Sequence, residues 1–118
     1  MSRARFFLSA AGLLLLTGMV HNQLVKSEPG SGAALRVSPT EVKLWFKERP
    51  EVALTSVTLM RADTTRITTI RAVATDDSLA VAAPLSSPLP AGEYLVAWRT
   101  ASNDGHVIRG MFGFTISP

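Results

Sequence analysis

The sequence predicts an all-β protein, a sandwich or small barrel of about seven short strands with Greek-key connections. The first observation behind this is that segments with a hydrophobic residue at every second position are separated by turn signals. The second is that no helical 3.6-residue pattern continues beyond the N-terminal segment. The third is that prolines would interrupt any long helix. These prolines are Pro39, Pro50, Pro84, Pro88 and Pro90.

The composition is that of one globular domain. The chain has 118 residues, of which 47% are hydrophobic and 18% are charged. It contains no cysteine, which excludes disulfides, iron–sulfur clusters, zinc–thiolate sites and cysteine nucleophiles. Its 2 histidines, His21 and His106, cannot supply a site of three imidazoles. Without Arg3 and Arg5, basic residues outnumber acidic ones by only one, so we expect no nucleic-acid partner.

Residues 1–20 have the layout of a secretory signal peptide. Arg3 and Arg5 give a positive start, and an apolar run over residues 6–16 follows. A membrane span needs about 20 apolar residues, which is more than this segment offers. We therefore expect export and cleavage before His21, with residues 21–118 as the mature domain. Val20 does not match the small residue that signal peptidases prefer there, so a leader retained as an anchor is the alternative.

The remaining chain divides into short strands. Alternating or β-branched hydrophobic residues mark them, and Gly, Pro, Asn and Asp mark the turns between them. The predicted strands cover residues 23–26, 41–46, 55–60, 67–73, 78–82, 94–100 and 107–116. Alternation separates the two faces of each long strand, and Tyr94, Trp98 and Met60 are expected to pack in the core. The groups that share a face are Val42, Leu44 and Phe46; Val57 and Leu59; Tyr94, Val96 and Trp98, opposite Leu95 and Ala97; and Phe112 and Phe114, opposite Met111.

Residues 101–106, Ala-Ser-Asn-Asp-Gly-His, are the most informative segment. Asn-Asp-Gly is a strong hairpin-turn signal, and on that interpretation Asp104 only shapes the turn and His106 is an exposed flank. The functional interpretation uses the same geometry. Asp104 and His106 are two residues apart, so in an extended segment they project to one side, within reach of one metal ion.

His21 would lie at the start of the mature chain. A terminal histidine brings its α-amine and its imidazole, although a residue in this place is often only a disordered end. With Asp104 and His106 it would give three nitrogens and one oxygen, a set that favours Cu(II) over zinc. The chain has no phosphate loop, nucleophile elbow or zinc helix, which favours binding over catalysis.

Four motifs resemble one known family. They are His21-x-x-Leu24-Val25-x-Ser27-x-Pro29, Val42-x-Leu44-x-Phe46-x-Glu48, Leu89-x-Ala91-Gly92-x-Tyr94-x-Val96-x-Trp98-Arg99 and Ser102-x-Asp104-Gly105-His106-x-Ile108-x-Gly110-x-Phe112-x-Phe114. With these residues, residues 21–118 resemble the CopC-like family, the periplasmic copper-resistance protein C.

The resemblance implies a seven-stranded Greek-key β-sandwich of the immunoglobulin or cupredoxin type. It implies a Cu(II) site made of the amine and imidazole of His21 with Asp104 and His106. Glu48 falls where some members of the family carry an acidic residue near the copper, and it is carried over only as an outer-shell group, because a Glu that ends a strand is more often a solvated surface charge. Met60 is the only methionine in the middle of the chain, so a Met-rich Cu(I) site is not expected.

The implied function is a periplasmic, non-enzymatic, monomeric copper protein. It would serve copper buffering, resistance or delivery to an inner-membrane copper transporter of the CopD type. The alternative is a non-metal exported β-sandwich interaction module, anchored in the membrane by an uncleaved leader.

Overall fold

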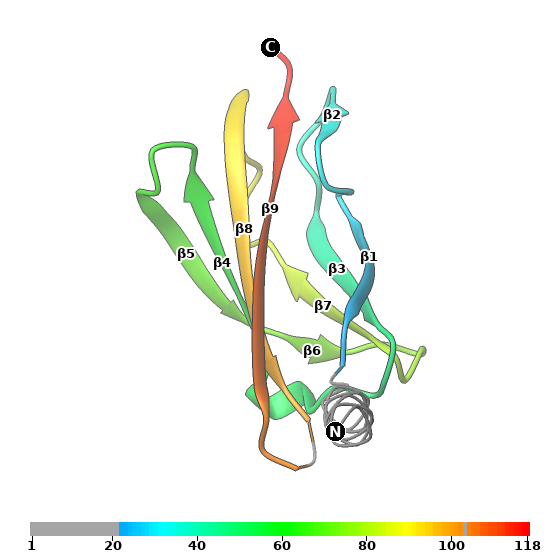
Figure 1. Ribbon diagram of the computed structural model, residues 1–118. Coiled ribbons are helices and arrows are strands. Elements are labelled where there is room, and N and C mark those ends of the chain that lie inside the picture. Colours follow the sequence, from blue (N-terminus) through cyan, green and yellow to red (C-terminus); the bar gives the residue numbers. More distant parts are fainter. Residues whose placement is uncertain (1–21, 103) are drawn as a thin grey trace, which may run out of the picture.

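The computed structural model describes residues 22–102 and 104–118 as two packed β-sheets (Figure 1). The first sheet has the order β1-β3-β7-β6, with β1 at Leu24–Glu28, β3 at Glu41–Phe46, β7 at Ala80–Pro84 and β6 at Val73–Ala74. The second has the order β2-β9-β8-β4-β5, with β2 at Ala33–Leu35, β9 at Val107–Ile116, β8 at Gly92–Ala101, β4 at Ser56–Arg61 and β5 at Arg66–Arg71.

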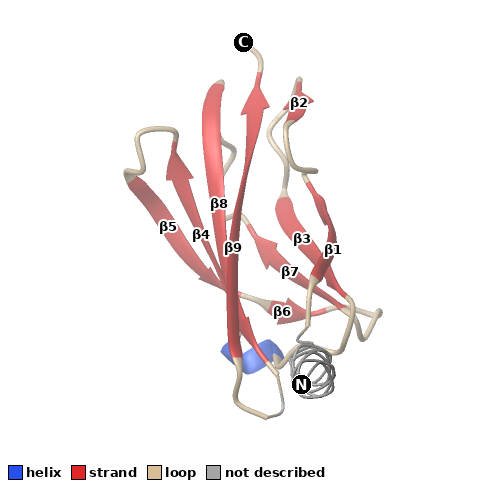
Figure 2. Cartoon of the chain, viewed as in Figure 1, coloured by secondary structure: helices blue, strands red, loops and turns tan. Residues whose placement is uncertain are grey.

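Strands dominate the described part of the chain, and a short 3₁₀ turn, η1 (Val52–Leu54), connects β3 to β4 (Figure 2). Strand pairs are antiparallel, except that β2 runs parallel to β9. Within residues 22–102 and 104–118, no helix has the length and hydropathy that crossing a membrane requires. The predicted all-β sandwich is confirmed.

The described part of the chain contains two more strands than the seven predicted. β2 is only three residues long, which is too short to show a period in the sequence. The predicted strand over residues 67–73 is in fact divided between the sheets, because β5 pairs with β4 whereas β6 pairs with β7. At the crossing, Ala72 is buried and its N–H donates to the carbonyl of Thr55 at 3.0 Å. A run of β-branched residues predicts an extended backbone, but it does not predict which of two sheets the strand joins.

The core lies between the sheets. Tyr94 and Trp98 are buried as expected, and in β3, β4, β8 and β9 one of the two alternating faces supplies the core. Phe46 of one sheet meets Trp98 of the other edge-on, with ring centroids 5.5 Å apart. Burying each large side chain stabilises the fold by roughly 1.5–3 kcal/mol. The expectation for Met60 was wrong, because it lies half-buried on the opposite face of β4 from Val57 and Leu59.

Strands β8 and β9, each ten residues long, form a hairpin that positions the candidate site. It pairs from Gly92 with Ile116 to Ala101 with Val107. The indole of Trp98 lies against Gly110, its cross-strand partner, and a Cβ at Gly110 would come within 2.7 Å of the indole Nε1. Glycine is therefore required here by close approach. The hairpin carries its turn, residues 102–106, to the end of the sandwich.

Candidate metal centre

The turn between β8 and β9 has the predicted hairpin character. Beyond the last strand pair, the Ser102 N–H donates to the carbonyl of His106 at 3.0 Å. The Gly105 N–H donates to the carbonyl of Ser102 at 2.9 Å. Gly105 has φ +85°, in the left-handed region where glycine carries no Cβ penalty. Both hydrogen bonds therefore join residues of the turn to one another.

Within this turn, Asp104 and His106 are in direct contact. His106 Nδ1 lies 2.8 Å from Asp104 Oδ2, and the His106 backbone N–H donates to Asp104 Oδ1 at 3.2 Å. The Ser102 hydroxyl donates to the same Oδ1. The side chain of Asp104 is 61% exposed and that of His106 is 58% exposed, so solvent and solutes reach both. The structure thus brings together two of the three residues predicted to bind metal.

These hydrogen bonds stabilise the ionised form of Asp104. The Ser102 hydroxyl, and after it the His106 ring and backbone, hold the pKa of the Asp104 carboxyl well below its usual range. The carboxylate is therefore ionised at neutral pH.

The described chain begins at the same end of the molecule. Asn22 is buried, and its side-chain amide donates from Nδ2 to the Glu48 carbonyl at 2.9 Å. Its Oδ1 accepts from the backbone N–H of Glu48 at 2.7 Å and from that of Gln23 at 3.0 Å. This pair of bonds between Asn22 and the Glu48 backbone fastens the residue after His21 to the loop that follows β3.

The same loop is connected to the end of β8. The Glu51 N–H donates to the carbonyl of Ala101 at 3.1 Å, directly before the turn. Figure 1 shows the start of β1, η1 and the β8–β9 turn at one end of the sandwich. Sequence reasoning missed Asn22, because a single asparagine beside a short strand carries no periodic or turn signal.

His21 lies outside the described residues, so its place relative to Asp104 and His106 is not part of this geometry. Within the described ranges, no group of three or more His, Asp or Glu side chains is arranged to hold a metal ion. Glu48 binds Asn22 through its backbone, and its side chain is exposed and forms no such group with Asp104 and His106. Among the described residues, the candidate centre therefore consists of two side chains that could bind a metal, Asp104 and His106.

Comparison with known proteins places the chain in a family. The CopC domain model matches residues 24–117. Copper resistance protein C of Pseudomonas syringae pv. tomato is 30% identical over 117 residues, covering 92% of this chain and 91% of that protein. Copper transport protein CutJ of Bacillus subtilis is 28% identical over 101 residues, covering 85% of this chain. The chain spans only 19% of the length of CutJ.

A solved structure shows the same architecture. The crystal structure of CopC from Methylosinus trichosporium OB3b superposes with a TM-score of 0.76 at 28% identity. The superposition covers 83% of this chain and 95% of that one. A family model over almost the whole described domain, relatives of matching length and a shared fold agree, and the chain belongs to the CopC domain family.

Proposed function

We propose that this protein is an exported, non-enzymatic copper-binding protein that holds one Cu(II) at the end of the sandwich beside the β8–β9 turn. Membership of the CopC domain family, and relatives named for copper resistance and copper transport, support copper as the cargo. The observation that carries the location is the exposed Asp104–His106 pair, at the end to which Asn22 fastens the start of the described chain.

In this proposal four donor atoms come from three residues. His21 supplies its α-amine and its imidazole after the leader, residues 1–20, is removed. His106 supplies a ring nitrogen, and Asp104 supplies a carboxylate oxygen that is already ionised. Three nitrogens and one oxygen are borderline ligands that suit Cu(II), which also heads the divalent affinity series.

The exposure of the donor pair suits a protein that gives up its metal. A site open to solvent exchanges its ion more readily than an enclosed one, so buffering in the periplasm and delivery to an inner-membrane copper transporter are both served. A partner of the CopD type is the transporter we propose. The chain acts as a monomer in this scheme, because each copy carries its own donor set.

The proposal is tested on protein exported under its own leader, by native mass spectrometry with one equivalent of Cu(II). We expect a chain that begins at His21 and retains one copper. His106→Ala, or one residue added before His21, should weaken Cu(II) binding at least about 100-fold, because each removes part of the donor set. Asp63→Asn is the matched control, since Asp63 is an exposed aspartate bonded to Thr65 in another turn.

The pH dependence adds a second readout. A free α-amine has a pKa of about 7.7–8.0 and must lose its proton to bind the metal, so affinity should fall as the pH drops below neutrality. Binding that stays constant between pH 5.5 and 7.5 would contradict the amine as a ligand. A longer chain that retains no copper would favour the membrane-anchored, non-metal interaction module instead.

A further inference from the structure

The outer face of the five-stranded sheet carries a row of arginines that runs across the strands. Arg109 of β9 pairs with Arg99 of β8, Arg99 pairs with Ser56 of β4, and Ser56 pairs with Arg71 of β5. Paired residues share a face, and this face is the one opposite the core residues Val57 and Trp98. We call Arg71, Arg99 and Arg109 the arginine row. With strands about 4.8 Å apart, it spans about 15 Å.

The sheet leaves these charges uncompensated. Its basic residues are all arginines, and they are Arg61, Arg66, Arg71, Arg99 and Arg109. Glu93 is the one acidic residue in its strands, six positions along β8 from Arg99. Within residues 22–102 and 104–118, the ion pair found is the one between His106 and Asp104. Because basic and acidic residues nearly balance outside the leader, the row reflects local segregation and not a basic chain.

Placing Arg99 directly opposite Arg109 works against folding. Like charges at opposed positions of an antiparallel pair destabilise it. Arg99 Nη1 donates to the Leu54 carbonyl at 3.4 Å, which uses one of the five N–H groups of its guanidinium. A fold that places like charges together without an internal counter-charge is suited to an external anion.

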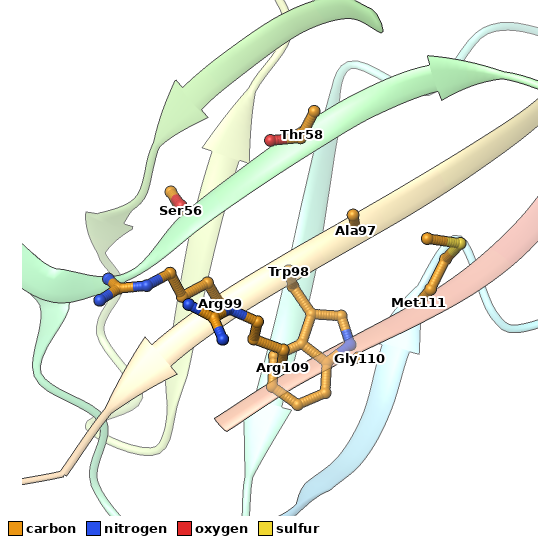
Figure 3. Close-up of a pocket in the computed structure, with 8 residues that line it drawn as sticks. All are labelled: Ser56, Thr58, Ala97, Trp98, Arg99, Arg109, Gly110 and Met111. Atoms are coloured by element: carbon orange, nitrogen blue, oxygen red, sulfur yellow. The ribbon is translucent and has the colours of Figure 1, made fainter. Parts of the chain in front are cut away.

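The row borders an apolar depression. A surface pocket of about 470 Å³ is lined by Ser56, Thr58, Ala97, Trp98, Arg99, Arg109, Gly110 and Met111. Figure 3 shows the Arg99 and Arg109 side chains next to each other, and Met111 on the other side of the pocket. Met111 is 58% exposed. Arginine and methionine are enriched where proteins bind one another.

We propose that the arginine row binds an extended acidic segment of a partner protein, with an apolar side chain of that segment in the depression beside Met111. Guanidinium groups match carboxylates in bidentate geometry. Alternate side chains of an extended segment are about 6.6–7 Å apart, so two or three carboxylates fit the 15 Å of the row. A single phosphate is too small for that span, and an apolar depression beside the charges suits a peptide better than a flat layer of headgroups.

The surface lies close to the candidate metal centre without depending on it. Arg99 and Arg109 are two strand pairs from Ala101 and Val107, where the β8–β9 turn begins. The binding test therefore uses metal-free protein, residues 21–118, in chelator. If the peptide does not bind, the copper proposal is unaffected. If copper does not bind, the proposal of a peptide-binding surface is unaffected.

The experiment titrates a deca-glutamate peptide carrying one central leucine into the protein at low salt, and measures affinity calorimetrically and amide shifts by NMR. We expect shifts centred on residues 56–58, 97–99 and 109–111. Arg99→Gln with Arg109→Gln should weaken binding at least about tenfold. Arg71→Gln with Arg109→Gln should do so too, and this variant keeps the Arg99–Leu54 bond. Raising the salt should weaken the wild type, because exposed charges are screened.

The matched control is Lys26→Gln with Lys43→Gln. These two lysines lie over the Trp45 ring, on the outer face of the other sheet, so the same net charge is removed elsewhere. An equal loss in the lysine and arginine variants would overturn the proposal, since only net charge would then matter. Peptide shifts centred away from both the arginine row and the depression beside it would overturn the proposal as well. Binding to vesicles of phosphatidylglycerol but not to the peptide would reassign the row to a membrane surface.

Discussion

At the residue scale, the pKa of Asp104 depends most on one hydroxyl. The Ser102 hydroxyl is the largest cause of the lowered Asp104 pKa, and His106 adds to it. We predict that Ser102→Ala raises the pKa of Asp104 toward its ordinary value of about 3.9. A pH titration of the Asp104 carboxyl carbon by NMR measures this. The pKa of Asp63, which hydrogen bonds to Thr65 lower, should not move.

The lowered pKa of Asp104 determines how its contribution to folding stability changes with pH. Because the folded-state pKa of Asp104 lies below the unfolded value, its contribution is fully present above about pH 4. It is lost as the pH falls through the lower folded pKa. Unfolding of Asp104→Asn compared with wild type at pH 6 and at pH 2.5 should show a smaller difference at the lower pH. An equal difference at both would contradict the assignment of the shift to Asp104.

Contacts between residues close together in the chain can be predicted from the sequence, and contacts between distant residues cannot. Asp104 and His106 are two residues apart, so spacing alone predicts that they meet, and they do. Asn22 could not be predicted in the same way. Its partners are the backbone groups of Glu48, 26 residues away, and they become available only after β1 pairs with β3. The contact between Asp104 and His106 can therefore be predicted from the sequence, whereas the bonds between Asn22 and the Glu48 backbone cannot.

At the element scale, two buried hydroxyls join η1 to the sheet. Thr55 Oγ1 donates to the Glu51 carbonyl at 2.7 Å, so the Thr100 hydroxyl must be the donor in its 2.7 Å bond to Thr55. Thr55→Val leaves both the Thr100 hydroxyl and the Glu51 carbonyl without this partner, whereas Thr100→Val removes one bond. We predict a loss of about 1–3 kcal/mol for Thr55→Val and less for Thr100→Val, measured by urea unfolding.

An exposed pair of the same chemistry is the control for this prediction. Thr58 and Thr69 share a hydrogen bond of 3.1 Å on the outer face of the sheet. Thr69→Val should change the free energy of unfolding by no more than about 0.5 kcal/mol, because water replaces the lost partner. If Thr69→Val and Thr55→Val were equally destabilising, burial of the hydroxyls would not be the cause.

Strand prediction succeeded where burial on one face imposes a period of two. In β3 and β8 every inward position is buried, so the pattern is visible without the fold. It failed over residues 66–74, where the chain leaves one sheet for the other at Ala72. A small buried residue between two exposed ones does not interrupt a β-branched run, and the choice of sheet depends on partners far along the chain.

At the scale of the whole molecule, the core and the candidate metal centre are separate. The core lies between the sheets, and Asp104 and His106 are exposed in a turn whose residues hydrogen bond to one another. Such a division predicts that the metal-free fold tolerates changes at the centre. It also predicts that metal binding adds to stability by mass action alone, since the centre forms in the folded chain.

We therefore predict that metal-free His106→Ala melts within a few degrees of wild type, as exposed substitutions change stability by about 0.5 kcal/mol or less. Cu(II) at about 100 times its Kd should stabilise the wild type by about 2.7 kcal/mol. In a domain of this size that is a rise in Tm of roughly 10–20 °C. His106→Ala at the same Cu(II) concentration should show little of this rise in a calorimetric scan. A large loss of Tm in the metal-free variant would mean that the turn supports the core. An equal rise with copper in both proteins would place the metal elsewhere.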